Sequence, residues 1–318
     1  ENESQIEQIP IINQRSRTFG LSWKRFYKNK NGFFNLSVSN NRLDNRFERF
    51  QNNLSKSNPS FSNISNEDET KFRFNSNHNS NNYKFSFGGN LQLSNYSNTT
   101  QYDFYNTNYN TKINFIKYGV FFKSSKTFIN DKLGISFGVR LDQDSFTEKN
   151  NVFENISPRI ALSLKISDDN KWKLNFASGR YFKIPTYTSL GFKDRNDMFL
   201  NKNSKYTRSD HYVGGLEFNW TESSRFTFET FYKKYNNYPI SLVDGVSIAN
   251  KGAGFEVLGN EKILTEGKGK SYGLEFLYQQ KLKNNFYGIL SYTFFYSKFS
   301  GFDNIYLPSV WDNRHLFS

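Results

Sequence analysis

The sequence predicts an all-β protein: a transmembrane antiparallel up-and-down β-barrel, here a partial, unclosed barrel of about 12–13 strands. Three observations predict it. Apolar and polar residues alternate along most of the 318 residues, the alternating segments are long, and short connections alternate with long ones. The chain is hydrophilic, with a mean hydropathy of −0.75, although 19% of its residues are aromatic. Because only every second residue of a membrane strand faces lipid, such strands combine both properties.

Alternation is clearest over residues 268–282. One face carries Tyr272, Leu274, Phe276 and Tyr278, and the other carries Gly273, Glu275 and Gln279. The same pattern occurs over 83–93, 133–142, 160–166, 212–220 and 286–297. We expect strands of mostly about 12–15 residues, whereas soluble strands centre on about 5–6 and a tilted membrane strand needs about 9–11. A soluble sandwich also alternates, but it does not need strands of this length.

Short and long connections alternate along the chain, so the short ones all fall at one end of the predicted strands. Short turns are predicted at 28–32, 77–82, 126–131, 167–171, 221–225 and 282–285. Long connections are predicted at 44–68, 98–107, 146–155, 183–207, 237–267 and 300–312, and a last strand begins within 313–318. Outer-membrane barrels have short periplasmic turns and longer extracellular loops. No window shows a helical period with caps, so no helix is predicted.

The composition argues against several other functions. Net charge is +13, but the basic residues are not clustered, so we expect no nucleic-acid binding. There is no cysteine, and the three histidines, His78, His211 and His315, lack metal-ligand spacing. The acidic run 67–69 is expected in a solvated connection. We therefore predict no enzyme activity, no catalytic residues, no metal and no cofactor.

The polar face of the strands is predicted to line the barrel interior. The lumen-facing residues under this register are Arg140, Asp142, Arg159, Lys173, Glu217, Glu229 and Glu275. Ligand capture is expected in extracellular loops, which carry function in most scaffolds. The connection 183–207 mixes aromatic and charged residues, and its candidate ligand contacts are Tyr187, Lys193, Asp194, Arg195 and Tyr206.

Several segments in residues 118–318 resemble the barrel of TonB-dependent outer-membrane receptors of the Bacteroidetes type. The run from Ile156-Ser157-Pro158-Arg159, followed by a short turn and Gly179-Arg180-Tyr181, resembles a strand–turn–strand unit of that family. The segments 132–142, 212–217, 229–235, 267–275 and 311–315 resemble its neighbouring strands, in the same order. Each motif is short, and the order and spacing together carry the resemblance.

The resemblance implies a barrel of about 22 strands filled by an N-terminal plug. Residues 1–318 would then be one partial β-barrel domain, with the plug and TonB box upstream of Glu1 and further strands beyond Ser318. It implies the outer membrane of a Gram-negative bacterium and active uptake of a siderophore, cobalamin, glycan or peptide. The implied partners are outer-membrane lipid, the TonB complex through the absent plug, a surface lipoprotein and the nutrient. The alternative is a non-energised porin, or a structural or adhesive barrel.

Overall fold

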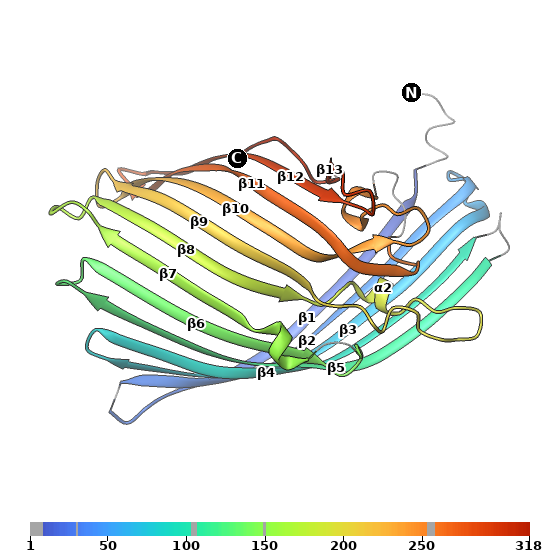
Figure 1. Ribbon diagram of the computed structural model, residues 1–318, viewed down its shortest axis with the longest axis horizontal. Helices are drawn as coiled ribbons and strands as arrows, with labels where there is room; N and C mark the ends of the chain where they lie inside the picture. Colours follow the sequence, from blue (N-terminus) through green and yellow to red (C-terminus); the bar gives the residue numbers. More distant parts are fainter. Residues whose placement is uncertain (1–8, 30, 103–106, 149–150, 253–257) are drawn as a thin grey trace.

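A computed structural model describes residues 9–29, 31–102, 107–148, 151–252 and 258–318. In these residues fourteen strands form a single antiparallel sheet in which each strand pairs with its neighbours in sequence, from β1 to β13, and β14 also pairs with β12. The sheet curls into an open trough (Figure 1). Within the described residues β1 pairs only with β2, so the sheet does not close. The predicted all-β, up-and-down, unclosed wall is confirmed.

The strands differ greatly in length. They are β1 (Ile11–Phe26), β2 (Gly32–Asn52), β3 (Ser57–Ser80), β4 (Tyr83–Tyr102), β5 (Thr107–Phe128), β6 (Leu133–Asp144), β7 (Ser157–Lys165), β8 (Trp172–Lys183), β9 (Thr207–Asn219), β10 (Ser224–Ser241), β11 (Ile263–Lys283), β12 (Phe286–Ser300), β13 (Tyr306–Pro308) and β14 (His315–Phe317). Two 3₁₀ helices, η1 (Val152–Asn155) and η2 (Ile248–Asn250), and one α-helical turn, α2 (Tyr187–Leu190), lie in the connections.

The expected strand length was too short for the first half of the chain. The strand β3 has 24 residues and β5 has 22. The expected connection 44–68 is wrong, because β2 and β3 continue their ladder up to the pair Asn52 and Ser57. Polar side chains in this segment suggested a loop, but strands that extend beyond a bilayer carry polar residues on both faces. In the expected connection 98–107 the strands also continue, and residues 103–106 lie outside the described residues.

The short turns occur where they were predicted, all at one end of the trough (Figure 1). Between β11 and β12 the turn is the pair Asn284 and Asn285, with φ of 50° and 62°. Asn81 likewise has φ of 48° between β3 and β4. Asparagine enters this left-handed region more easily than most residues, and two-residue hairpins need it. The abundant asparagine of this chain thus has a local structural use.

The two faces of the sheet differ in chemistry. The helix α2 packs on one face, which lies inside the trough and is called the inner face below (Figure 1). The opposite, outer face exposes large apolar side chains along the strands, among them Phe176, Phe228 and Leu274 at 43%, 48% and 43%. Apolar residues at alternate positions on the outside are those of a wall in lipid. No helix in the described ranges is long and apolar enough to cross a membrane.

Candidate functional site

The connection between β8 and β9, residues 184–206, folds back onto the inner face and is called the α2 loop. Its helical turn begins after the cap residue Thr186, whose Oγ1 accepts the Ser189 N–H at 3.4 Å. Leu190 is completely buried and packs with Tyr187 in a cluster on β4 and β5. The other buried members are Tyr96, Ile113 and Phe115. An apolar contact therefore holds the loop against β4 and β5, which are not adjacent in the sheet to β8 and β9, the two strands that the loop connects.

A polar cluster lies beside these apolar residues. The hydroxyl of Tyr187 donates to Glu69 Oε1 at 2.5 Å and accepts a hydrogen bond from Lys117. The same carboxylate pairs with Lys71 at 2.7 Å and with Lys117 at 3.2 Å. Gln92 Nε2 also donates to Glu69 Oε1, at 2.6 Å. Since a half-buried carboxylate needs partners, these contacts both satisfy Glu69 and fix the loop.

Two tyrosine hydroxyls of the loop are kept protonated. Burial and the hydrogen bond to Glu69 raise the pKa of Tyr187 above its ordinary 10.0. Burial and the negative charge of Asp144 raise the pKa of Tyr206 in the same way. Tyr206 donates to Asp144 Oδ2 at 2.7 Å. Asp144 in turn accepts the backbone N–H of Phe146 at 2.7 Å, so it organises the start of the next connection. Each tyrosine is thus a hydrogen-bond donor that anchors the loop.

Asn201 joins three segments. Its Nδ2 donates to Ser189 O at 2.7 Å and to Glu261 O at 2.9 Å, and its Oδ1 accepts from Ile263 N at 3.0 Å. Asn201 is 1% exposed, so these are buried hydrogen bonds. They link the α2 loop to the connection 242–262 and to the start of β11. The α2 loop and the described parts of this connection, residues 242–252 and 258–262, therefore form one assembly over the inner face at the end opposite to the short turns.

An ion pair stabilises the connection 242–262. Lys251 Nζ lies 3.0 Å from Asp244 Oδ2 and 2.9 Å from Glu261 Oε1. Burial opposes the charge of Lys251, but its hydrogen bonds to Glu261 and Asp244 outweigh this and raise its pKa above 10.5. Burial likewise opposes the charge of Asp244, yet the Val246 N–H and Lys251 lower its pKa below 3.8.

A hollow of about 600 Å³ opens on the inner face beneath the α2 loop. Its charged lining residues are Arg73, Lys117, Arg140, Lys183 and Asp142, and Tyr206 and Phe121 also contribute. Arg140 binds Asp142 in a bidentate pair at 2.5 and 2.6 Å and also Asn90 Oδ1 at 2.6 Å. Arg73 and Lys183 are exposed, and neither forms an ion pair within the part of the chain that the structure describes. The hollow therefore presents excess positive charge to whatever occupies it.

The other predicted lumen residues lie on the inner face further along the strands. Lys173 pairs with Glu217 at 2.8 Å. The guanidinium of Arg159 lies 4.2 Å from the centre of the Tyr181 ring. Glu229 and Glu275 stand directly opposite each other on β10 and β11. All seven residues thus occupy one face, but they form separate pairs along the wall and do not converge on one site.

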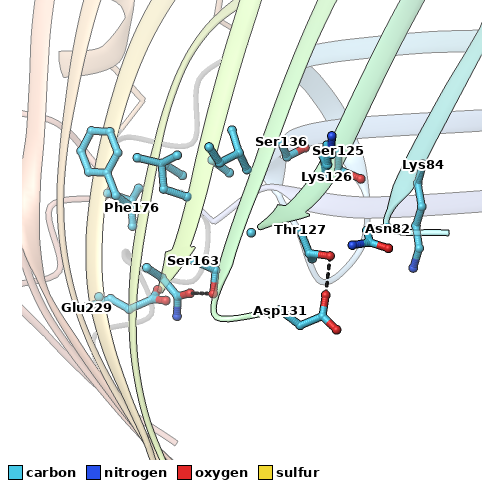
Figure 2. Close-up of a pocket in the computed structure, with 18 of the residues that line it drawn as sticks. Asn82, Lys84, Ser125, Lys126, Thr127, Asp131, Ser136, Ser163, Phe176 and Glu229 are labelled. Atoms are coloured by element: carbon cyan, nitrogen blue, oxygen red, sulfur yellow. Dashed lines mark hydrogen bonds between the residues drawn. The ribbon is translucent and has the colours of Figure 1, made fainter. Parts of the chain in front are cut away.

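A second hollow, of about 650 Å³, lies toward the short turns. Figure 2 shows Ser136, Ser163 and Glu229 along its wall, with Thr127 and Asp131 joined by a 2.6 Å hydrogen bond at its rim. Its lining also includes the small residues Ala161, Ala177 and Gly215. Small side chains leave this part of the inner face open for a bulky neighbour.

The five candidate ligand contacts of the α2 loop fall into two groups. Tyr187 and Tyr206 are 8% and 4% exposed and bind carboxylates of this chain. Lys193, Asp194 and Arg195 lie at a hairpin tip, where the Asp194 side chain accepts the Asn196 and Met198 N–H groups at 2.9 Å each. Arg195 is exposed there. The structure therefore separates anchoring tyrosines from a charged, accessible tip.

Sequence reasoning did not single out Asn201, Lys117 or Glu69 as parts of this site. The run 67–69 was expected in a connection, which is wrong: it lies inside β3. Alternation places Glu69 on the inner face, whereas Asp68 on the opposite face accepts a hydrogen bond from Asn40 at 2.9 Å. In the described residues no three histidine, cysteine or acidic side chains gather as metal ligands.

Comparisons with solved structures agree with this architecture. The pyoverdine outer-membrane receptor FpvA from Pseudomonas aeruginosa PAO1 superposes with a TM-score of 0.67 at 10% identity, over 96% of this chain and 47% of that chain. The alcaligin receptor FauA from Bordetella pertussis gives 0.59 at 13% identity, over 97% and 50%. The siderophore receptor PirA from Pseudomonas aeruginosa gives 0.59 at 12%, over 92% and 51%. The chain thus spans about half the length of these receptors, and the likeness shows the fold.

Sequence comparison identifies the family. No curated protein matches the chain. The family described as TonB dependent receptor-like, beta-barrel matches residues 7–317, which is nearly the whole chain. The chain therefore belongs to the TonB-dependent receptor-like β-barrel family, whose members lie in the outer membrane of Gram-negative bacteria.

Proposed function

We propose that this chain is part of the wall of an outer-membrane receptor that actively takes up a nutrient, by binding and transport rather than by catalysis. The observation that carries the proposal is the basic hollow on the inner face, which is lined in part by Ile184 and Tyr206 of the α2 loop. Asn201 of the same loop is bonded to Glu261 O. Such an arrangement suits a vestibule that captures a ligand before it passes along the wall. The family match supports energised transport.

The charge of the hollow favours an anionic nutrient. Arg73 and Lys183 are its exposed cations, and guanidinium groups bind carboxylate-like oxygens in a fixed fork geometry. We propose a metal–chelate complex that carries negative oxygens, as a ferric siderophore does, ahead of cobalamin, a neutral glycan or a peptide. Lys193, Asp194 and Arg195 at the accessible tip of the α2 loop are the proposed first contacts.

The proposed partners follow from the two faces and the second hollow. The apolar outer face would contact membrane lipid. The second hollow, lined by small side chains, would receive a plug domain through which the TonB complex acts. A surface lipoprotein that delivers ligand would approach the α2 loop from outside the cell.

Transport is tested with the complete receptor in its host. Cells that express it should accumulate a radiolabelled ferric siderophore, and deletion of TonB should abolish accumulation without reducing surface binding. Changing both Arg73→Gln and Lys183→Gln should weaken binding by at least about tenfold, because each substitution removes a charged hydrogen-bond donor. The control is Lys171→Gln with Lys283→Gln, which removes the same charge at exposed positions near the short turns and should bind normally.

The alternative is a passive porin, or a structural or adhesive barrel. Uptake measurements distinguish this alternative from energised transport. In a passive barrel, solute entry would rise linearly with concentration and would persist after deletion of TonB. Equal uptake with and without TonB, across all four ligand classes, would overturn the proposal of energised transport.

A further inference from the structure

Charged residues form a continuous row across the outer face of β8 to β12. Arg180 stands opposite Asp210, Asp210 opposite Lys234, Lys234 opposite Lys270, and Lys270 opposite Lys298. Directly opposed residues of an antiparallel pair share a face. Arg180 alternates in β8 with the exposed outer residues Leu174 and Phe176, so the row is on the outer face. It is called the cationic row below.

The cationic row carries a strong excess of positive charge. Asp210 is shared between Arg180 at 2.6 Å and Arg208 at 3.2 Å. Lys234 and Lys268 are exposed, and Arg180 has 41% of its side chain exposed. Glu266 lies two residues before Lys268 in β11 and shares its face. Six cations, Arg180, Arg208, Lys234, Lys268, Lys270 and Lys298, therefore face two carboxylates.

A row of tyrosines lies two residues from the cationic row, on the side of the short turns. Tyr212 stands opposite Tyr232, Tyr232 opposite Tyr272, and Tyr272 opposite Tyr296. The ring centroids of Tyr232 and Tyr272 are 6.5 Å apart, and those of Tyr272 and Tyr296 are 5.4 Å apart. Tyrosine girdles mark the boundary between hydrocarbon and headgroups. The cationic row therefore begins where the headgroups of the outer leaflet begin.

The excess of positive charge is larger here than in the row of opposed residues across β1 to β5. On β3 to β5, the residues just beyond the exposed apolar pair Leu93 and Ile116 are Asp68, Asn95 and Asn114, which stand opposite one another. That row continues onto β2 and β1 through Arg42 and Arg17, so its five residues are two cations, one carboxylate and two amides. Its net charge is +1, whereas the five opposed residues Arg180, Asp210, Lys234, Lys270 and Lys298 carry +3.

We propose that the cationic row binds the phosphorylated headgroup of an outer-leaflet glycolipid, whose acyl chains lie on the apolar outer face below the tyrosines. An amphiphile satisfies both surfaces at once, because its phosphates meet the lysines and its chains meet the tyrosine row and the strands. A soluble polyanion would meet only the cations. The proposal depends on the position of the wall in the outer membrane and not on nutrient uptake.

The test is binding of defined lipids to the complete receptor, extracted in a mild detergent and followed by native mass spectrometry. The probes are lipid A with two phosphates, lipid A without phosphates, and zwitterionic phosphatidylethanolamine. The variant is Lys234→Gln with Lys270→Gln and Lys298→Gln. Each cation near an anionic lipid surface contributes roughly fivefold, so the triple variant should bind bisphosphorylated lipid A about a hundredfold more weakly.

Two controls separate charge from folding. Lys126→Gln with Lys171→Gln and Lys283→Gln removes the same charge near the short turns and should leave lipid binding unchanged. Lys234→Arg with Lys270→Arg and Lys298→Arg keeps the charge and should restore binding. Equal affinity for the two lipid A forms, or an unchanged affinity of the glutamine variant, would overturn the proposal. So would an arginine variant as weak as the glutamine variant, since packing rather than charge would then be the cause.

Discussion

Tyr187 combines an apolar and a polar contact in one side chain. Its ring meets Phe115 edge to face, with centroids 5.3 Å apart, and its hydroxyl bridges Glu69 and Lys117. Tyrosine suits a buried position of this kind only when its hydroxyl finds a partner. The α2 loop therefore depends on a carboxylate that lies 118 residues earlier in the chain.

Replacing Tyr187 by phenylalanine separates the two contacts. The variant keeps the ring but loses a hydrogen bond to a charged group, which contributes about 1.5–3 kcal/mol. Hydrogen exchange at the Leu190 and Gly191 amides, which bond to Thr186 O and Tyr187 O, should become about ten- to a hundredfold faster. Tyr287→Phe, at a side chain 74% exposed, is the control and should not change it. Unaltered exchange in Tyr187→Phe would mean that the apolar contact alone holds the loop.

The ion pair of Lys251 predicts a pH window for the connection 242–262. The pKa of Lys251 is raised, so its stabilisation is complete below pH 10.5 and is lost as the pH rises through the higher folded value. The pKa of Asp244 is lowered, so its contribution is present above pH 3.8 and is lost as the pH falls through the lower folded value. A fluorophore on Val243→Cys should therefore report a constant environment between these limits and a transition beyond each.

A matched variant identifies the source of these transitions. Lys251→Met with the same label should remove the alkaline transition and weaken the acid one. Labelling is selective because the sequence contains no other cysteine. A transition near neutral pH would contradict the assignment, because neither group titrates there.

At the scale of elements, α2 is too short to be stable by itself. A helix of four residues cannot form from propensity alone, and sequence periodicity cannot detect it. It forms because Leu190 and Tyr187 pack against the apolar side chains of Tyr96 on β4 and of Ile113 and Phe115 on β5. The strands, in contrast, were predictable, because alternation over a dozen residues is a local signal. Their ends were not, because polar extensions beyond the bilayer look like loops in sequence.

Leu190→Ala should therefore release α2. Truncating a fully buried leucine costs about 2–5 kcal/mol, which corresponds to at least about a thirtyfold larger open population. In a Ser189→Cys background, where the native side chain is 1% exposed, a maleimide should label the loop faster by that factor. Leu54→Ala in the same background is the control, since Leu54 is 88% exposed. Equal labelling rates in the two variants would show that α2 docks without Leu190.

At the scale of the molecule, the open sheet has two edges. β1 carries Phe19, Leu21 and Trp23 at 66%, 78% and 55% exposure, next to a backbone edge that pairs with no strand among the described residues. At the other side β12 is only partly covered by the three-residue strands β13 and β14. Exposed edges of this length pair readily with other chains.

The polypeptide 1–318, produced alone and refolded in detergent, should therefore self-associate. Sedimentation in a density-matched detergent should show broad, concentration-dependent oligomers, whereas the complete receptor should sediment as a discrete species. A single monomeric species of the 318-residue polypeptide over a tenfold range of concentration would contradict this expectation, because the edges would then have closed on each other.

The sequence by itself determined the class of fold, the direction of each face and the end at which the short turns lie. These follow from period-two alternation and from the alternation of short with long connections, both of which can be read along the chain without knowing which distant residues meet. Only the tertiary structure decided that the α2 loop returns to β4 and β5, that Glu69 meets Tyr187, and that Lys234, Lys270 and Lys298 stand in one row. Those contacts depend on strand register and on the curvature of the sheet, which relate residues that no local pattern connects.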